Sequence, residues 1–220
     1  MEKEEKIRVS QKRKKTKTII AWSLIFVFVA LGISGIIFLV SKSADLNGGG
    51  VSLPASLIFA EDDWLKGGEK AELTLIEYSD FQCPACANFH PIINKLADDF
   101  NNDLKIIYRH FPLPQHKNAV LAAKAGEAAG KQRKFWEMSG LIFNNQDEWS
   151  EESGQNARDI FKKFASELNL DIAQFENDLE SEEIKKSIDD DYKNGVKLGI
   201  NATPTFFLNG KKITNPRSYE

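Results

Sequence analysis

The sequence predicts an α/β domain that follows a single transmembrane helix, and three observations lead to this fold class. Residues 19–40 form one uncharged apolar run. Farther along, two β-like segments at 71–78 and 104–111 flank a stretch in which apolar residues follow helical spacing. The only two cysteines of the chain, Cys83 and Cys86, stand at the start of that helical stretch. Together these features predict a βαβ unit that carries a cysteine pair.

The bulk composition fits one folded domain with an additional segment. The chain has 220 residues, of which 42% are hydrophobic and 28% are charged, so a sizeable core can form. The net charge of −3 is spread unevenly: residues 1–40 carry eight basic and three acidic residues, and the remainder carries 21 basic and 29 acidic residues. Because nucleic-acid binding needs a basic face, the acidic remainder argues against a nucleic acid as partner.

The apolar run at 19–40 is long enough to cross a membrane. A helix of its 22 residues would measure about 33 Å, against a hydrocarbon core of about 30 Å. Basic residues crowd positions 12–17, so the positive-inside rule places residues 1–18 in the cytoplasm and the domain outside. A cleaved signal peptide is the alternative, but its apolar region is usually about 7–15 residues long. We therefore expect an uncleaved, single-pass signal anchor in the cell membrane.

The segment after the anchor divides into a linker and a domain. Residues 41–68 contain a glycine run and a proline and are predicted to be a linker. The domain is predicted at 69–220, and its strand, helix and strand should form a parallel pair with a right-handed crossover. Amphipathic helices are expected from about 118 to 198, followed by a strand, an Asn-Gly turn at 209–210 and a second strand. The predicted order is βαβ, helical block, ββ.

The spacing of Cys83 and Cys86 predicts redox chemistry. With Pro84 in the first turn, Cys83 would lie at the N-terminus of the helix, where free N–H groups and the helix dipole stabilise a thiolate. Its pKa should therefore be lowered, which makes Cys83 the nucleophile and Cys86, one turn deeper, the resolving thiol. A structural disulfide is disfavoured because so small a loop removes little entropy from the unfolded chain.

A metal site is the competing hypothesis for the same segment. Cys83, Cys86 and His90 have C-x2-C-x3-H spacing, which could bind zinc or copper. A structural zinc site usually needs four protein ligands, and the other histidines, His110 and His116, lie on later segments. We therefore predict no metal and place His90 on the helix surface.

Two further positions are candidate site residues. Glu77 precedes Cys83 by six residues on a strand that should be buried. Burial raises the pKa of a carboxyl group, so Glu77 could take the proton of Cys86 near neutral pH; an exposed glutamate at a strand end is the alternative. Pro204 would start a strand, where it removes a ladder donor and leaves the strand edge free, and a cis bond there would fix a tight corner.

Three segments, LIEYSDFQCPACANFHP, YRHFPLPQHKNAVLAAKAGEAAGKQRKFWEM and GINATPTFFLNG, together resemble the DsbA-like thiol–disulfide oxidoreductases of the membrane-anchored bacterial type. The resemblance covers residues from about 61 to 220. It implies a thioredoxin fold with a helical insertion between its βαβ and ββα halves. It also implies that Cys83 and Cys86 form the redox-active couple and that no cofactor is needed.

The resemblance assigns roles to further residues. Pro204 would be the cis-proline that faces the couple, and Thr203 before it would influence substrate pairing. Glu77 matches the buried acid of the family, and Pro91 matches the proline within its helix. The chain departs from the family pattern in two ways. The dipeptide between the cysteines is Pro-Ala, and we expect the final helix after the hairpin to be missing.

The sequence therefore predicts an extracytoplasmic enzyme that introduces disulfides into exported cysteine-containing proteins and exchanges electrons with a membrane redox partner. Because the dipeptide between the cysteines helps to set the potential, a disulfide reductase or isomerase is the alternative among enzymes. A copper- or zinc-binding protein that uses Cys83, Cys86 and a histidine is the alternative outside enzymes.

Overall fold

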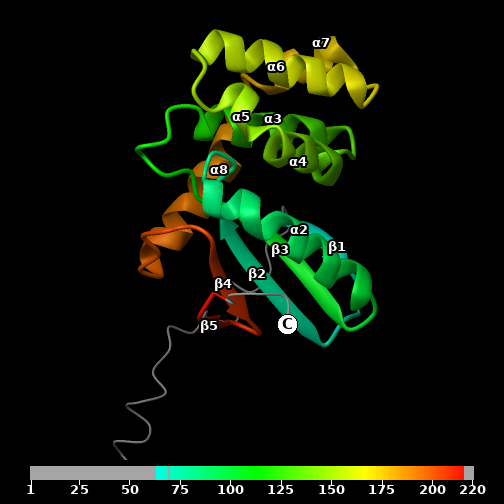
Figure 1. The fold of residues 1–220 in the computed structure, drawn as a ribbon, viewed down its shortest axis with the longest axis vertical. Coiled ribbons are helices and arrows are strands. Elements are labelled where there is room, and N and C mark those ends of the chain that lie inside the picture. The colour runs from blue at the N-terminus through cyan, green and yellow to red at the C-terminus, as the bar shows by residue number, and fades with distance from the viewer. Residues whose placement is uncertain (1–62, 69, 216–220) are drawn as a thin grey trace, which may run out of the picture. The chain divides into compact units, whose positions relative to one another are not determined.

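The computed structural model describes residues 63–68 and 70–215, within a compact unit that spans 50–220. In Figure 1 the sheet and α2 form one half of this unit, α3 to α7 form a helical block in the other half, and α8 runs from the block back to the sheet. The elements in chain order are β1 (Trp64–Gly67), β2 (Leu73–Ser79), α2 (Pro84–Asp99), β3 (Leu104–His110), α3 (Ala119–Lys131), α4 (Phe135–Asn144), α5 (Gln146–Trp149), α6 (Gly154–Glu167), α7 (Ile172–Asp178), α8 (Glu182–Lys197), β4 (Thr205–Leu208) and β5 (Lys211–Ile213).

The five strands form one mixed sheet in the order β1-β3-β2-β4-β5. The central pair, β2 and β3, is parallel, whereas the other three pairs are antiparallel. In the parallel pair, Glu77 lies opposite Tyr108. The predicted βαβ unit and C-terminal β-hairpin are thus confirmed, and the cysteine helix α2 is the crossover between the parallel strands.

Both faces of the central strands are buried, which explains their nearly continuous apolar sequences. Leu75 and Ile106 face the cluster that includes Ile93 of α2. The alternating residues Ile76 and Ile107 belong to a second cluster on the side of α8, together with Leu198 and Ile200. Because successive side chains of a strand point to opposite faces, each strand contributes to both layers.

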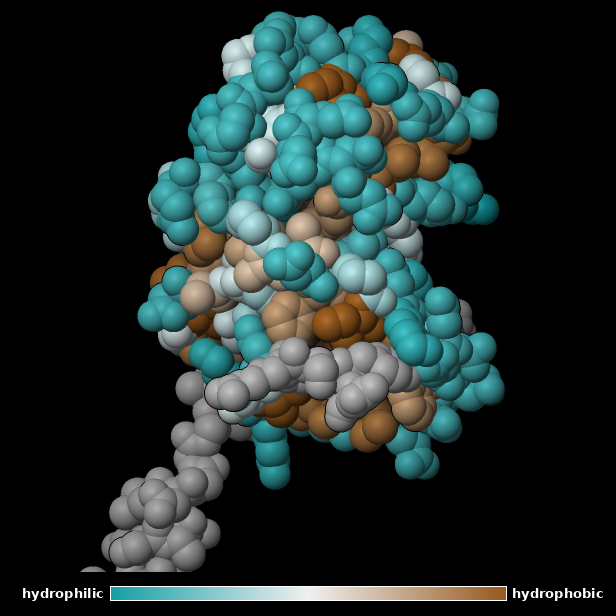
Figure 2. Space-filling view, viewed as in Figure 1, coloured by the Kyte–Doolittle hydropathy of each residue, from teal (hydrophilic) through white to brown (hydrophobic). Residues whose placement is uncertain are grey.

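The helical block has its own core of aromatic and alanine side chains. Trp149 and Phe161 are fully buried in it, with ring centroids 5.1 Å apart. The small side chains of α3 let α4, α7 and α8 approach it closely, and Ala122, Ala125 and Ala128 of that helix have no exposed surface. Figure 2 shows mostly polar side chains over the outer surface of this block, and apolar side chains nearer the sheet.

The predicted linker is wrong at its C-terminal end. Residues 64–67, assigned to the linker, form β1 and pair antiparallel with β3. The ring of Trp64 stacks on Phe135 at 4.6 Å and packs against Gly130, where any Cβ would clash with it. A strand of four residues that ends in a glycine and is followed by another lacks the length and alternation that identify a strand from sequence, so its tertiary contacts define it.

The turn of the C-terminal hairpin matches its prediction. Asn209 and Gly210 both have positive φ, at 46° and 78°, as a type I′ turn requires. Pro91 lies inside α2, as the resemblance implied.

Several sequence-based predictions lie outside the described residues. These are the cytoplasmic tail at 1–18, the anchor at 19–40, most of the linker and the missing final helix, which concerns the chain after the hairpin. Among residues 63–68 and 70–215, no helix has both the length and the apolar character needed to cross a membrane.

Candidate functional site: the Cys83–Cys86 couple

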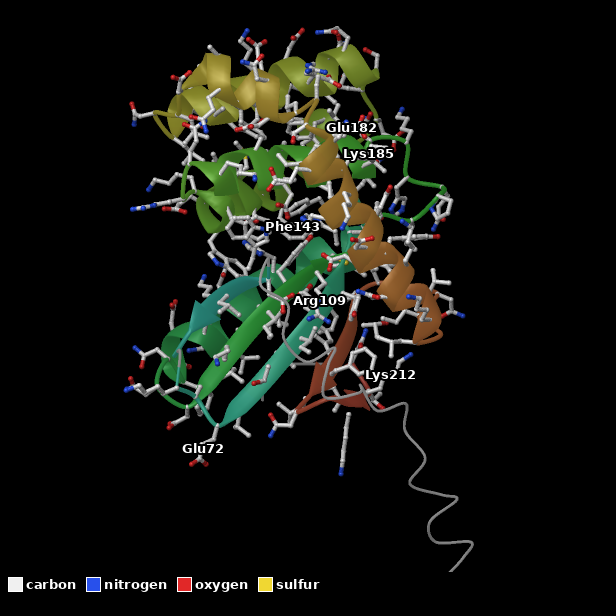
Figure 3. The ribbon with its side chains drawn as sticks, turned by 180° about the vertical axis from the view of Figure 1, so that it is seen from behind. Glu72, Arg109, Phe143, Glu182, Lys185 and Lys212 are labelled. Carbon is white, nitrogen blue, oxygen red and sulfur yellow. The ribbon has the colours of Figure 1, made fainter. Side chains whose placement is uncertain are left out.

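The cysteine pair lies at the end of β2 that faces the helical block. In Figure 3, Phe143 marks the junction between the block and the sheet, and Glu72 marks the opposite end of the sheet. Cys83 is the N-cap of α2, with φ −77° and ψ 119°, and Pro84 occupies the first turn. Its amide donates to the Asp80 carbonyl at 3.0 Å. The predicted placement of the nucleophile at the helix N-terminus is confirmed.

The surroundings of Cys83 stabilise its thiolate. The Cys86 thiol is the largest contributor that lowers the pKa of Cys83, followed by the Thr203 hydroxyl and the amides of Cys86 and Ala85. Partial burial opposes them, yet the pKa falls from 9.0 to about 5. Cys83 therefore carries a negative charge at neutral pH, as expected of a cysteine at a helix N-terminus.

Cys86 has the opposite character. It has no exposed surface, and burial raises its pKa far above the ordinary value, with further increases from Cys83 and Glu77. One thiol is thus ionised and partly accessible while the other is protonated and enclosed. This asymmetry divides the roles as the sequence predicted, since Cys83 can attack or leave and Cys86 must exchange a proton to act.

Glu77 is buried behind the couple, so its alternative as an exposed strand-end residue is wrong. It lies in the middle of β2 with 4% exposure, and burial raises its pKa from 4.5 to about 7. A carboxyl group with this pKa can give or accept a proton under physiological conditions. Its charge raises the pKa of Cys86, which places the two groups within electrostatic reach of each other.

Two hydroxyl groups near this carboxyl were missed from the sequence. Ser79 Oγ and Tyr108 Oη are buried and have no hydrogen-bond partner among the described residues. The Ser79 hydroxyl lowers the pKa of both Glu77 and Cys86, so it lies within reach of both groups. Buried polar atoms are rarely left without partners, so these hydroxyls are available to a proton that moves between the acid and the thiol. A serine and a tyrosine on strands give no signal of this role in a single sequence.

Glu77→Gln is expected to stabilise the protein above pH 7 while slowing Cys86. Burial raises the pKa of Glu77 in the folded state. As far as this carboxyl is concerned, the protein is therefore most stable below about pH 4.5, where the group is neutral, and it loses that stability as pH rises through about 7. Removal of the charge should restore up to about 3 kcal/mol at pH 8. Loss of the proton acceptor should slow resolution by Cys86 by about a hundredfold. Denaturant unfolding at several pH values and stopped-flow thiol exchange would measure the two effects.

Asp191 provides the matched control. Burial also raises its pKa to about 7, but its carboxylate accepts from the His110 amide at 2.9 Å and does not act on either cysteine. Asp191→Asn should change the pH dependence of stability without slowing Cys86. Equal slowing in both variants would show that Glu77 has no special part in proton transfer.

The loop before β4 brings Thr203 and Pro204 to the couple. The peptide bond between them is cis, as predicted. The Cys83 thiol donates to the Thr203 carbonyl at 3.5 Å, although 120 residues separate them. Thr203 Oγ1 is buried and has no hydrogen-bond partner among the described residues, and it lowers the pKa of Cys83, so it can donate to a Cys83 thiolate. The structure thus brings the Thr203 carbonyl to 3.5 Å from Cys83 and Glu77 within electrostatic reach of Cys86, while Pro204 is placed by its cis bond to Thr203.

His90 does not lie on the helix surface, and that prediction is wrong. Its ring is 9% exposed and packs on Phe143 at 4.9 Å, between α2 and α4. Its Nε2 shares a hydrogen bond with Asn94 Nδ2 at 2.9 Å, and burial, with Lys66, lowers its pKa to about 4. In the described part of the chain, no three His, Cys, Asp or Glu residues are grouped as a metal would require. The low exposure of His90 and its contact with Phe143 therefore identify it as a core residue.

The comparison with protein families agrees with this geometry. A family described as Thioredoxin matches residues 60–220. The chain belongs to the thioredoxin family. Among solved structures, alpha-DsbA1 of Wolbachia pipientis is 27% identical with a TM-score of 0.63, and the match covers 70% of this chain and 77% of that one. Oxidised BdbD of Bacillus subtilis is 26% identical with a TM-score of 0.64, covering 76% and 90%. These neighbours confirm a DsbA-like thioredoxin fold.

Curated relatives place a similar sequence inside much longer proteins. The Na(+)/H(+) antiporter NhaA 1 of Mycolicibacterium gilvum is 38% identical over 161 residues, which is 71% of this chain but 25% of that protein. The corresponding antiporter of Mycolicibacterium vanbaalenii is 38% identical over 159 residues, or 24% of its length. The chain thus spans about a quarter of the length of these proteins. Their names refer to the whole proteins and not to the matching part alone.

Proposed function

We propose that this chain is a thiol–disulfide oxidoreductase that works outside the cell membrane and oxidises cysteines of exported proteins. The observation that carries the proposal is the placement of the couple: Cys83 is the N-cap of α2 and lies 3.5 Å from the Thr203 carbonyl, and Cys86 is enclosed one turn deeper. A low pKa of the Cys83 thiol favours the reduced form and so makes the disulfide an electron acceptor. The names of the DsbA-type structural neighbours support the same activity.

The proposed reaction begins from the Cys83–Cys86 disulfide. A substrate thiolate attacks Cys83 Sγ, the bond between the two cysteines breaks, and Cys86 leaves with an electron pair and takes a proton, for which Glu77 is the nearest candidate. A second substrate thiolate then attacks the substrate sulfur of the mixed disulfide and expels Cys83 as a thiolate. The substrate loses two electrons and gains a disulfide, and the enzyme holds one thiolate and one thiol.

Substrate binding is proposed beside the cis-proline loop. The Thr203 carbonyl lies 3.5 Å from the Cys83 sulfur, so a peptide paired with this loop would place its own sulfur next to the nucleophile. Main-chain hydrogen bonds of this kind tolerate many sequences, which suits an enzyme with varied exported substrates.

Regeneration and location complete the proposal. Two electrons must leave the reduced couple in each cycle, and we propose a membrane-bound disulfide-bearing oxidase as their acceptor. The anchor predicted at 19–40 and the positive-inside rule support a domain on the outer side, where disulfides persist. The antiporter names of the longer relatives are not carried over, because the chain matches only a quarter of those proteins.

The test is oxidation of a reduced peptide with two cysteines by the purified chain. We expect one disulfide formed per oxidised enzyme, with the couple reduced in step, and multiple turnovers when an oxidant is added. If the couple cannot be cycled by glutathione buffers and the reduced protein instead retains one zinc or copper ion, the redox proposal fails and the metal-binding alternative replaces it.

A further inference from the structure

The residue immediately before the nucleophile is a buried glutamine whose side chain joins two parts of the molecule. Gln82 is 6% exposed. Its Nε2 donates to the Ser150 carbonyl at 2.7 Å, and its Oε1 accepts from the Asn118 amide at 2.7 Å. Both partners belong to the helical block: Asn118 is the N-cap of α3, and Ser150 ends α5. One carboxamide thus connects the start of α2 with two helix ends of the insertion.

The partner surface is itself fixed by hydrogen bonds. Asn118 is 3% exposed, and its Nδ2 lies within 3.0 to 3.2 Å of three carbonyl oxygens, those of Trp149, Ser150 and Glu152. The Gln82 side chain therefore contacts a surface whose own polar groups are hydrogen-bonded within the helical block. This matters because a hydrogen bond can fix the backbone at Gln82 only if the group that it binds is itself fixed by other contacts.

A second set of contacts holds the residues before Gln82. Asp80 Oδ1 accepts from the Gln82 amide at 2.8 Å, and its Oδ2 accepts from the Leu113 amide at 2.8 Å. Gln146 Nε2 of α5 donates to the Phe81 carbonyl at 2.8 Å. Every residue from 80 to 82 is thus tied by a side-chain hydrogen bond to a part of the fold outside α2.

These hydrogen bonds fix the chain directly before Cys83. The reactivity of the Cys83 sulfur depends on where that chain places it. The amides of Ala85 and Cys86 stabilise the Cys83 thiolate, together with the cis-proline loop. Such contacts weaken steeply with distance and angle, so a shift of the N-cap would lessen the stabilisation. The hydrogen bonds of Gln82 and of the Phe81 carbonyl reach the insertion, whereas Asp80 binds Leu113 in the loop before α3, so the insertion supplies the partners nearest to Cys83.

We propose that Gln82 is a positioning residue for the nucleophile, and that it makes the reactivity of Cys83 depend on the docked helical block. This inference rests on the proposed redox function, and it gives the insertion a role beyond covering the sheet. Gln82 touches neither substrate nor sulfur in this role and acts through the backbone that it holds.

The main variant is Gln82→Met in the full chain, which keeps the volume of the side chain and removes both hydrogen bonds. We expect the pKa of Cys83, followed by thiolate absorbance, to rise by about one unit. The equilibrium constant with glutathione should shift tenfold toward the disulfide, about 30 mV for a two-electron couple. The alkylation rate at pH 6 should fall by about half, because the thiolate fraction falls from about 0.9 to about 0.5.

Gln132→Met is the matched control. Its carboxamide makes the same pair of backbone bonds, donating to the Asp171 carbonyl at 3.0 Å and accepting from the Asp171 amide at 2.8 Å, at the junction of α3 and α7. Gln132→Met should lower the melting temperature, because two hydrogen bonds are lost. It should leave the pKa of Cys83 and the equilibrium constant with glutathione unchanged. A merely structural role of Gln82 would give this same pattern.

A milder variant protects the test against misfolding. Gln146→Ala removes one anchor from the same loop at a half-buried position, so the fold should tolerate it, and the pKa of Cys83 should move in the same direction by a smaller amount. If both Gln82→Met and Gln146→Ala leave the pKa and the equilibrium constant within twofold of the parent, the proposal is wrong. Absence of any reversible couple in the parent would instead remove the proposed function itself.

Discussion

Cys83→Ser is expected to reduce disulfide exchange by at least about a thousandfold, to the level of uncatalysed thiols. Cys83 is the only ionised sulfur at the site, and the Cys86 thiol is enclosed and held protonated by burial. A serine hydroxyl cannot form a disulfide, so neither the resting bond nor the mixed disulfide can exist. The rate of oxidation of a reduced two-cysteine peptide, measured with the purified variant, checks this expectation.

Cys86→Ala gives the complementary result. The enclosed thiol cannot resolve a mixed disulfide once it is removed, so substrates attached at Cys83 should accumulate as stable adducts. Mass spectrometry of the variant after incubation with an oxidised peptide would show them. Turnover by Cys83→Ser near that of the parent, or adducts that attach elsewhere than Cys83 in Cys86→Ala, would contradict the assignment of nucleophile and resolving thiol.

The sequence predicted the placement of the cysteine pair well because that placement is local. The positions of Cys83, Pro84 and Cys86 within one helical turn determine which sulfur meets the helix end, and the structure places Cys83 at the N-cap. The parallel strands were equally accessible from the sequence, because their apolar runs are continuous and a helix lies between them. The positions of Thr203 and Pro204 beside the couple came from the resemblance, since 120 residues separate Thr203 from Cys83.

The errors arose where tertiary contacts outweigh local pattern. His90 has the spacing of a metal ligand and of an exposed helix residue, but α4 covers it with Phe143. β1 is defined by the stacking of Trp64 on a helix 70 residues away, which no window of sequence contains. No role was assigned to Gln82 from the sequence, because its partners are backbone groups of the insertion. Roles of this kind depend on the fold and leave no compositional signal.

The reduction potential should depend on pH in a way that reveals the two thiols separately. Below about pH 5, reduction takes up two protons for two electrons, and the potential should fall by about 59 mV per pH unit. Above about pH 5, Cys83 remains a thiolate and only Cys86 takes a proton, so the slope should halve to about 30 mV per unit. Two thiols of ordinary pKa would keep the steeper slope up to about pH 9.

The same ionisation stabilises the reduced fold, and the sign follows from the direction of the shift. The pKa of Cys83 is lowered on folding, so its contribution is complete above the unfolded value near 9 and is lost as pH falls through about 5. At pH 7 the thiolate should favour the reduced form by about 2.7 kcal/mol, or about 60 mV toward the oxidising side. Cys86 stays protonated throughout this window because burial raises its pKa, so it adds no pH dependence to the stability of the reduced fold.

Potentials measured against glutathione from pH 4 to 9, together with unfolding of the oxidised and reduced forms, test both statements. Glu77→Gln serves as the control, because a proton on Glu77 near pH 7 could bend the profile if its pKa differs between the two redox states. A break near pH 5 that persists in this variant assigns the ionisation to Cys83. A value near about −120 mV at pH 7 would mark a disulfide donor, whereas one near about −270 mV would mark a reductase. A slope of about 59 mV across the whole range would show that Cys83 is not ionised, and the proposed oxidase would lose its driving force.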